Sequence, residues 1–147
     1  MTDATADTIA RLHAAAFQTA RAWSVDEMEA LLASPHIFVV TMPHGFAMGR
    51  VIVDEAELLT VAVHREQQGK GIGRQLLQQF EQQAQTRGAT RAFLEVAQDN
   101  ETARALYLSA GWTESGRRTG YYARRGSGNA DAILLHKHLP LGEPSEK

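Results

Sequence analysis

Residues 61–74 read VAVHREQQGKGIGR, and this stretch decides the fold because it joins a strand pattern to a helix pattern. The run 58–63 is apolar and rich in β-branched residues, which is typical of a β-strand. Beyond Gly73, apolar residues recur at helical spacing until Ala84, and Gly88 follows as a helix stop. A glycine-rich loop between a strand and a helix exposes amide N–H groups at the positive end of the helix dipole, where they can hold a phosphate.

The glycine loop does not match the two commonest phosphate-binding patterns. A dinucleotide fingerprint beginning at Gly69 would need glycine at position 74, which is Arg74. A P-loop would need serine or threonine after Lys70, where the chain has Gly71. The pattern that remains is Gln68-x-x-Gly71-x-Gly73, which arises by chance in roughly one chain in seven of this length. An ordinary tight turn therefore remains an alternative, but the position of the pattern before an amphipathic helix favours an anion site.

Helix and strand patterns alternate along the rest of the chain. Two helices are expected first, at 5–20 and from the capping box of Ser24 and Glu27 to Pro35. Strands are expected at 37–40, 46–53, 58–63, 92–96, 111–122 and 130–138, with an acidic connection at 54–57. Further helices are expected at 72–87 and 100–110. This order predicts a single mixed α/β domain over 5–138, followed by a frayed tail at 139–147.

Composition excludes several classes of protein. The chain has 147 residues, 44% hydrophobic and 22% charged, which fits one globular domain. No apolar run approaches the ~18 residues of a membrane span, and the first residues show no secretory signal. The absence of cysteine excludes disulfides, thiolate metal sites and cysteine nucleophiles, and fits a cytoplasmic protein. A net charge of -2 argues against extended nucleic-acid binding.

Several spaced motifs agree with the glycine loop. They are Val61-Ala62-Val63, Gln68-x-x-Gly71-x-Gly73-Arg74-x-Leu76-Leu77, Leu94-Glu95-Val96, Asn100, Ala105-Leu106-Tyr107, Gly111-Trp112, Trp23-Ser24, Arg117-Arg118, Tyr121-Tyr122 and Asp131-Ala132-Ile133. With these motifs, residues 20–138 resemble the GNAT acyltransferase superfamily, and within it the bacterial ribosomal-protein alanine N-acetyltransferases. The resemblance implies a three-layer α+β fold, with a central, mixed, mostly antiparallel twisted sheet and about four flanking helices. Members usually begin with an extra strand, for which the residues before Thr5 leave little room.

The resemblance implies acetyl-CoA as the acetyl donor and no metal. Main-chain groups of Val61 and Val63 would bind the pantetheine arm, and the amides of 68–74 would bind the pyrophosphate. The expected cofactor-binding residues are Val61, Ala62, Val63, Gln68, Gly69, Lys70, Gly71, Ile72, Gly73, Arg74 and Asn100. Asn100 can also be a helix N-cap, and the two roles are compatible.

Glu95 and Tyr107 are the candidate catalytic residues. Glu95 is an acidic residue inside an apolar strand. It is a rim carboxylate, a carboxylate paired with arginine or, as the resemblance implies, a general base. Tyr107 shares a helix face with Ala103 and Ala110, so it is either a core aromatic or, as the resemblance implies, the general acid. Ordinary pKa values of about 10 for tyrosine and ~8.5 for a thiol make that proton transfer cost roughly 2 kcal/mol. Without an evident nucleophile for a covalent intermediate, direct attack on the thioester is expected, with a strand N–H polarising its carbonyl.

The acceptor follows from amine basicity. An α-amino group has a pKa of about 7.7 to 8.0, whereas lysine has about 10.4, so freeing lysine at pH 7 costs ~3.5 kcal/mol more. This favours a protein N-terminus, such as that of a ribosomal protein, as the resemblance also implies. A small amine or a lysine, and a non-catalytic acyl-CoA-binding module, remain the alternatives.

The remaining polar clusters are less specific. His136 and His138 would share one strand face, which is more typical of a sheet surface than of a zinc site. The basic cluster from Arg117 to Arg125 contains Tyr121 and Tyr122. It indicates either a solvated hairpin or a flap that lines an acceptor groove, in preference to a nucleic-acid site.

Overall fold

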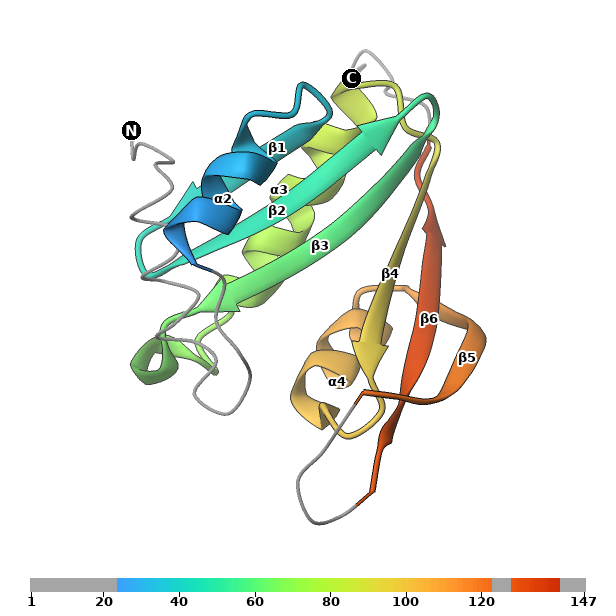
Figure 1. The fold of residues 1–147 in the computed structure, drawn as a ribbon. Coiled ribbons are helices and arrows are strands. Elements are labelled where there is room, and N and C mark those ends of the chain that lie inside the picture. Colours follow the sequence, from blue (N-terminus) through green and yellow to red (C-terminus); the bar gives the residue numbers. More distant parts are fainter. Residues whose placement is uncertain (1–23, 123–127, 141–147) are drawn as a thin grey trace.

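The computed structural model describes residues 24–122 and 128–140 (Figure 1). Its strands are β1 (Ile37–Met42), β2 (Gly45–Ile52), β3 (Glu55–Val63), β4 (Arg91–Ala97), β5 (Thr113–Tyr122) and β6 (Ala130–His138). Its helices are α2 (Val25–Leu32), α3 (Ile72–Thr86) and α4 (Glu101–Ser109), with a short 3-10 turn at Arg65–Gln67. Ser24 and Glu27 form the expected capping box at the start of α2.

The strands form one six-stranded sheet in the order β1-β2-β3-β4-β6-β5. Neighbouring strands are antiparallel except β3 and β4, which are parallel. The expected mixed, mostly antiparallel sheet is therefore confirmed. The described residues contain three α-helices. The helix expected at 5–20 and the position of any earlier strand lie outside them.

The third strand begins earlier than predicted. Residues from Glu55 to Glu57 were expected in the acidic connection and belong to β3 instead, so that prediction is wrong. Their carboxylates pair with arginines on the neighbouring strands, Glu57 with Arg50 of β2 and Glu55 with Arg91 of β4. Opposite charges on adjacent strands support a pairing that acidic composition alone disfavours.

Two boundaries near the C-terminal half also differ from the prediction. The strand expected from Gly111 starts at Thr113, because the N–H of Trp112 still donates to the Tyr107 carbonyl at 3.1 Å and closes α4. Leu139, which the sequence assigned to the tail, is only 3% exposed. Its N–H donates to the Thr90 carbonyl at 2.9 Å.

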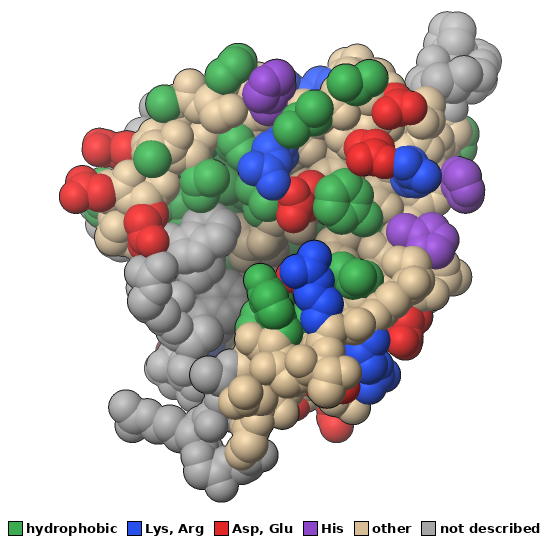
Figure 2. Space-filling view, turned by 45° about the vertical axis from the view of Figure 1, so that its right-hand side comes forward, with side chains coloured by type: hydrophobic (Ala, Val, Ile, Leu, Met, Phe, Trp, Pro, Cys, Tyr) green, Lys and Arg blue, Asp and Glu red, His purple; other side chains and the backbone are tan. Residues whose placement is uncertain are grey.

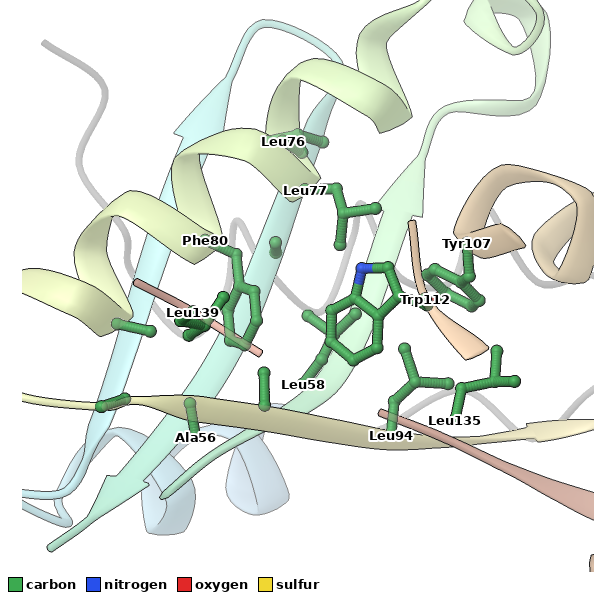
Figure 3. Packing of buried hydrophobic residues seen from close by; sticks show 14 of the residues in the cluster. Ala56, Leu58, Leu76, Leu77, Phe80, Leu94, Tyr107, Trp112, Leu135 and Leu139 are labelled. Atoms are coloured by element: carbon green, nitrogen blue, oxygen red, sulfur yellow. The ribbon is translucent and has the colours of Figure 1, made fainter. Parts of the chain in front are cut away.

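The main core lies between the sheet and the helices α3 and α4, which cover one of its faces (Figures 1 and 3). Phe80 of α3 is fully buried and stacks on Phe38 of β1 with ring centroids 5.6 Å apart. Gly49 of β2 leaves room for this ring, since a Cβ there would lie 2.4 Å from the Phe80 ring. A smaller cluster around Met28, Phe46 and other residues packs beneath α2 on the opposite face.

The two parallel strands separate after a short contact. Only three pairs join them, Glu55–Arg91, Ala56–Ala92 and Glu57–Phe93. Beyond these pairs β3 continues along β2 and β4 continues along β6, so the strands diverge toward their C-terminal ends (Figure 1). No helix in the described part of the chain is long and apolar enough to cross a membrane.

Replacing Phe80 with alanine should lower the free energy of unfolding by about 3–5 kcal/mol, because it leaves a cavity beside Phe38. Urea unfolding followed by circular dichroism measures the change. The control is Leu108→Ala on α4, a side chain 50% exposed, which should cost less than about 1 kcal/mol. Equal losses for the two variants would contradict the assignment of Phe80 to the core.

Candidate functional site

The diverging strands turn main-chain groups toward each other. The N–H of His64 donates to the His44 carbonyl at 2.7 Å, in the same register as the β2–β3 pairs. Hydrogen-bonded pairs alternate along antiparallel strands, so the main-chain N–H and C=O of Val61 and Val63 point away from β2. The same argument applies to β4, where the N–H of Gln98 donates to the Asp131 carbonyl of the β6 side at 2.8 Å.

On that register, the main-chain groups of Glu95 and Ala97 point away from β6. They face the side on which Val61 and Val63 present theirs, beyond the last β3–β4 pair. Ala62 lies between the two valines. Its side chain is fully buried beneath α2, and on the same register its main-chain N–H and C=O point toward β2. The opening thus offers extended, polar backbone on both of its edges, which suits an extended ligand with amide groups.

The glycine loop ends at an open helix N-terminus. Gly71 is the N-cap of α3, with φ of 85° and no side-chain cap. Gly69 also has a positive φ, of 82°, and a Cβ at either position would meet no atom within 4 Å. The glycines are therefore needed for the backbone turn and leave its outer surface free. The N–H groups of the first turn, from Ile72 to Arg74, are directed to where an anion can bind.

Three polar side chains border this loop. Gln68 donates from Nε2 to the Val63 carbonyl at 3.0 Å and so connects the loop to the end of β3. Lys70 donates to Gln67, and Arg74 donates to the hydroxyl of Ser109 on α4. Both cations are exposed, so either can turn toward an anionic ligand.

Gly73 and Asn100 have structural roles next to the loop. A Cβ on Gly73 would lie 3.3 Å from Leu106, so glycine lets α3 approach α4 closely. Asn100 is the N-cap of α4, with Oδ1 accepting from the Ala103 N–H at 3.2 Å. The capping role foreseen for Asn100 is confirmed.

Glu95 lies on the other face of β4 from the main core. Its neighbours Leu94 and Val96 are buried in that core, whereas the Glu95 side chain is 26% exposed. Its Oε2 lies 3.1 Å from Nε of Arg118 on β5. A carboxylate paired with arginine was one of the alternatives for Glu95. Which arginine it would meet could not be predicted from local pattern, because β6 lies between the two strands.

Tyr107 is a buried aromatic with an unusual hydroxyl. Its ring is 8% exposed and lies 6.2 Å from the Trp112 ring, centroid to centroid (Figure 3). Burial raises the pKa of Tyr107 to about 12. No hydrogen bond to this hydroxyl is found within the described residues. Buried polar groups in proteins usually have a hydrogen-bond partner, so this hydroxyl is a candidate for a functional role.

The hairpin of β5 and β6 is held by Asp131, whose importance the sequence pattern did not reveal. Its Oδ1 accepts from the Gly120 N–H at 2.8 Å, and Oδ2 lies 3.2 Å from Arg117. The Gly120 hydrogen bond, together with Arg117, holds the pKa of Asp131 below its usual value. Arg124 and Arg125 of the predicted basic cluster lie outside the described residues.

The sheet face that carries Glu95 has mixed charge, with basic and acidic side chains interleaved (Figure 2). A shallow depression on it is lined by Glu55, Arg91, Phe93, Ser115, His136 and His138. The two histidines share a face as predicted. No group of three metal-ligating side chains occurs within residues 24–122 and 128–140.

Comparisons with known proteins agree with this geometry. The model of the acetyltransferase (GNAT) family matches residues 6–112. An N-alpha-acetyltransferase RimI of Mycobacterium tuberculosis is 36% identical and the match covers 99% of this chain and 92% of that protein. The crystal structure of the ribosomal-protein-S18-alanine N-acetyltransferase of Escherichia coli superposes with a TM-score of 0.83, at 26% identity, over 100% of this chain and 96% of that one.

A ribosomal protein bS18-alanine N-acetyltransferase of Salmonella typhimurium is 40% identical over 91 residues. That match covers 62% of this chain and 61% of the relative, so the chain is matched to less than two thirds of the relative's length.

The raised pKa of Tyr107 predicts an alkaline dependence of stability. In the unfolded chain tyrosine ionises near pH 10, whereas in the folded chain Tyr107 ionises near pH 12. The contribution of Tyr107 to the free energy of unfolding is therefore complete below pH 10 and is lost as the pH rises through 12. This contribution is at most about 3 kcal/mol. Urea unfolding between pH 8 and 12 should show a steeper alkaline loss in the wild type than in Tyr107→Phe. Parallel losses in the two proteins would contradict the burial of the hydroxyl.

Proposed function

Because the chain belongs to the GNAT acetyltransferase family, we propose that it transfers an acetyl group from acetyl-CoA to the α-amino group at the N-terminus of a protein. The observation that carries the proposal is the divergence of β3 from β4 beside the uncapped N-terminus of α3. This arrangement supplies extended backbone for a pantetheine arm and free N–H groups for a pyrophosphate within one site.

The donor site is built mainly from main chain. Val61 and Val63 hydrogen-bond the pantetheine, and the amides from Gln68 to Arg74 bind the pyrophosphate. The residues proposed to bind the donor are Val61, Ala62, Val63, Gln68, Gly69, Lys70, Gly71, Ile72, Gly73, Arg74 and Asn100. Asn100 keeps its cap to Ala103 while its amide nitrogen stays available to the donor.

Glu95 and Tyr107 serve the two proton transfers from opposite faces of β4. Glu95 accepts a proton from the acceptor's ammonium, directly or through a water, so that the neutral amine can attack the thioester carbon. A strand N–H at the opening stabilises the carbonyl oxygen as it becomes negative. Tyr107 donates its proton to the sulfur as the carbon–sulfur bond breaks, and the second proton, which the nitrogen loses as it becomes an amide, passes through solvent and restores the Tyr107 hydroxyl.

The burial of Tyr107 changes the energetics expected from its sequence. With a pKa of about 12 in the free chain, the gap to a thiol near ~8.5 is about 3.5 pKa units, or roughly 5 kcal/mol, compared with the 2 kcal/mol obtained from ordinary values. The proton therefore stays on Tyr107 until negative charge has developed on the sulfur. This timing fits a concerted collapse in which proton donation and departure of the thiolate coincide.

The acceptor we propose is an N-terminal alanine, as in ribosomal protein S18. The names of the relatives from Salmonella typhimurium and Mycobacterium tuberculosis support an α-amino acceptor. The lower basicity of an α-amino group supports it independently, since deprotonating lysine costs ~3.5 kcal/mol more at pH 7. A ribosomal acceptor would place the protein in the cytoplasm. A single catalytic domain over 5–138 is part of the same proposal.

The acceptor is tested by supplying acetyl-CoA with two peptides of the same sequence. One peptide has a free alanine N-terminus and blocked lysines, and the other has a blocked N-terminus and a free lysine. We expect thiol release and acetylated product only with the first. Turnover of lysine alone, or of small amines alone, would contradict the acceptor, and acetyl-CoA binding without turnover of any amine would indicate a binding module.

Replacing Tyr107 with phenylalanine should lower kcat about 10²-fold, because the leaving sulfur loses its proton donor while the ring still packs on Trp112. Steady-state kinetics with the alanine peptide measures the loss. Calorimetric titration with acetyl-CoA should show unchanged affinity, which separates the chemical step from donor binding. An unchanged kcat would remove Tyr107 from the mechanism.

A further inference from the structure

The carboxylate of Glu95 is held by one partner from a distant strand. Nε of Arg118 lies 3.1 Å from Oε2, and within the described residues no other side chain pairs with Glu95. The order of the strands is β4-β6-β5, so this ion pair reaches over β6, where Glu95 is opposite Leu134 and Arg118 is opposite Ala132. It is therefore not a pair that neighbouring strands would form by register alone.

The backbone of β5 is irregular directly after Arg118. Pairing of β5 with β6 is irregular between Arg118 and Tyr122, and Gly120 has φ of 64° within that interval. The carboxylate of Asp131 fixes the irregular segment, because it accepts from the Gly120 N–H and pairs with Arg117. The hydrogen bond from Gly120 also holds the pKa of Asp131 below its usual value, so this support persists at neutral pH.

An aromatic ring also contacts the guanidinium of Arg118. The Arg118 guanidinium carbon lies 5.3 Å from the centroid of the Tyr121 ring, within the range of a cation–π contact. Arg118 is thus placed by the ring of Tyr121 and by a backbone irregularity that Asp131 holds.

The energetics argue that this arrangement serves more than stability. The side chains of Arg118 and Glu95 are 55% and 26% exposed, and ion pairs this open to solvent contribute little to folding. An ion pair nevertheless restricts the rotamers of a long carboxylate side chain. Here it is made through Oε2, and no partner of Oε1 is found within residues 24–122 and 128–140. A general base works only when its free oxygen is held within reach of the proton it takes.

We propose that Arg118 is a positioning residue that fixes Glu95 for proton transfer from the acceptor. The inference rests on the proposed function, since it requires Glu95 to be the base. Arg118 binds Oε2 and keeps Oε1 on the acceptor side, and Asp131 and Tyr121 act by placing Arg118.

The test is a double-mutant cycle on Arg118 and Glu95 with the alanine peptide as acceptor. Arg118→Gln should lower kcat about tenfold and leave the KM for acetyl-CoA unchanged. Arg118→Lys keeps the charge and should recover part of the loss. In a Glu95→Gln background, adding Arg118→Gln should change kcat less than about twofold, because Arg118 then has no base to position.

Arg91→Gln is the matched control. Like Arg118, Arg91 has a side chain that is 55% exposed and paired with a carboxylate. It lies on the same face of β4 as Glu95, near the start of the strand. Its replacement removes the same charge from the same surface and should leave kcat unchanged. Thermal unfolding of each variant checks that it folds, and Asp131→Asn, which loosens the segment without touching Glu95, should lower kcat severalfold.

Each contrary result has a distinct meaning. A wild-type kcat in Arg118→Gln, or a further tenfold loss in the Glu95→Gln background, overturns the positioning role and leaves the proposed function standing. A lower KM for the peptide with unchanged kcat also overturns it, because the guanidinium would then compete with the acceptor. If Glu95→Gln alone keeps the wild-type kcat, both the assigned base and this inference fail, while N-terminal acetylation itself is judged by the peptide assay.

Discussion

The proposed donor site depends on two parallel strands that pair at only three positions. Because β3 stays with β2 and β4 stays with β6 after Glu57 and Phe93, main-chain groups that would normally satisfy each other are left facing an opening. Unpaired strand edges inside a sheet are unfavourable unless a ligand or another segment completes them. The proposed donor supplies amide groups of the same kind, so the strand separation and the choice of ligand have one physical cause.

Helix α3 supplies the second half of the proposed donor site. Its N-terminus is uncapped by any side chain, and the two flanking glycines have φ values that other residues rarely adopt. The opposite end of the same helix is packed through Phe80 and Ala84 into the main core. The proposed anion site thus lies on a helix whose position is set by the core.

Local pattern was sufficient to predict most of the fold and the glycine loop before α3. The alternation of Leu94, Glu95 and Val96 predicted a strand with one polar face, and the run after Gly73 predicted α3. What depends on contacts between distant segments was not predictable. The start of β3 at Glu55 required Arg91 on another strand, and the pairing of Glu95 with Arg118 required the sheet order. The pKa of Tyr107 depends on burial by the assembled core, which no spacing reveals.

Hydrogen bonds join β3 and β4 near their N-terminal ends, far from the proposed catalytic residues. The N–H of Thr90, just before β4, donates to the Asp54 carbonyl at 2.8 Å, and the Thr90 carbonyl accepts from Leu139. From this tie to Val63 the chain extends for roughly 25 Å of strand, so a rotation of about 2° at the tie moves the far end by nearly an ångström. Displacements of that size at a reacting centre can cost about 10²-fold in rate. The contacts among Asp54, Thr90 and Leu139 therefore bear on the width of the opening, and with it on the alignment of donor and acceptor in the proposed reaction.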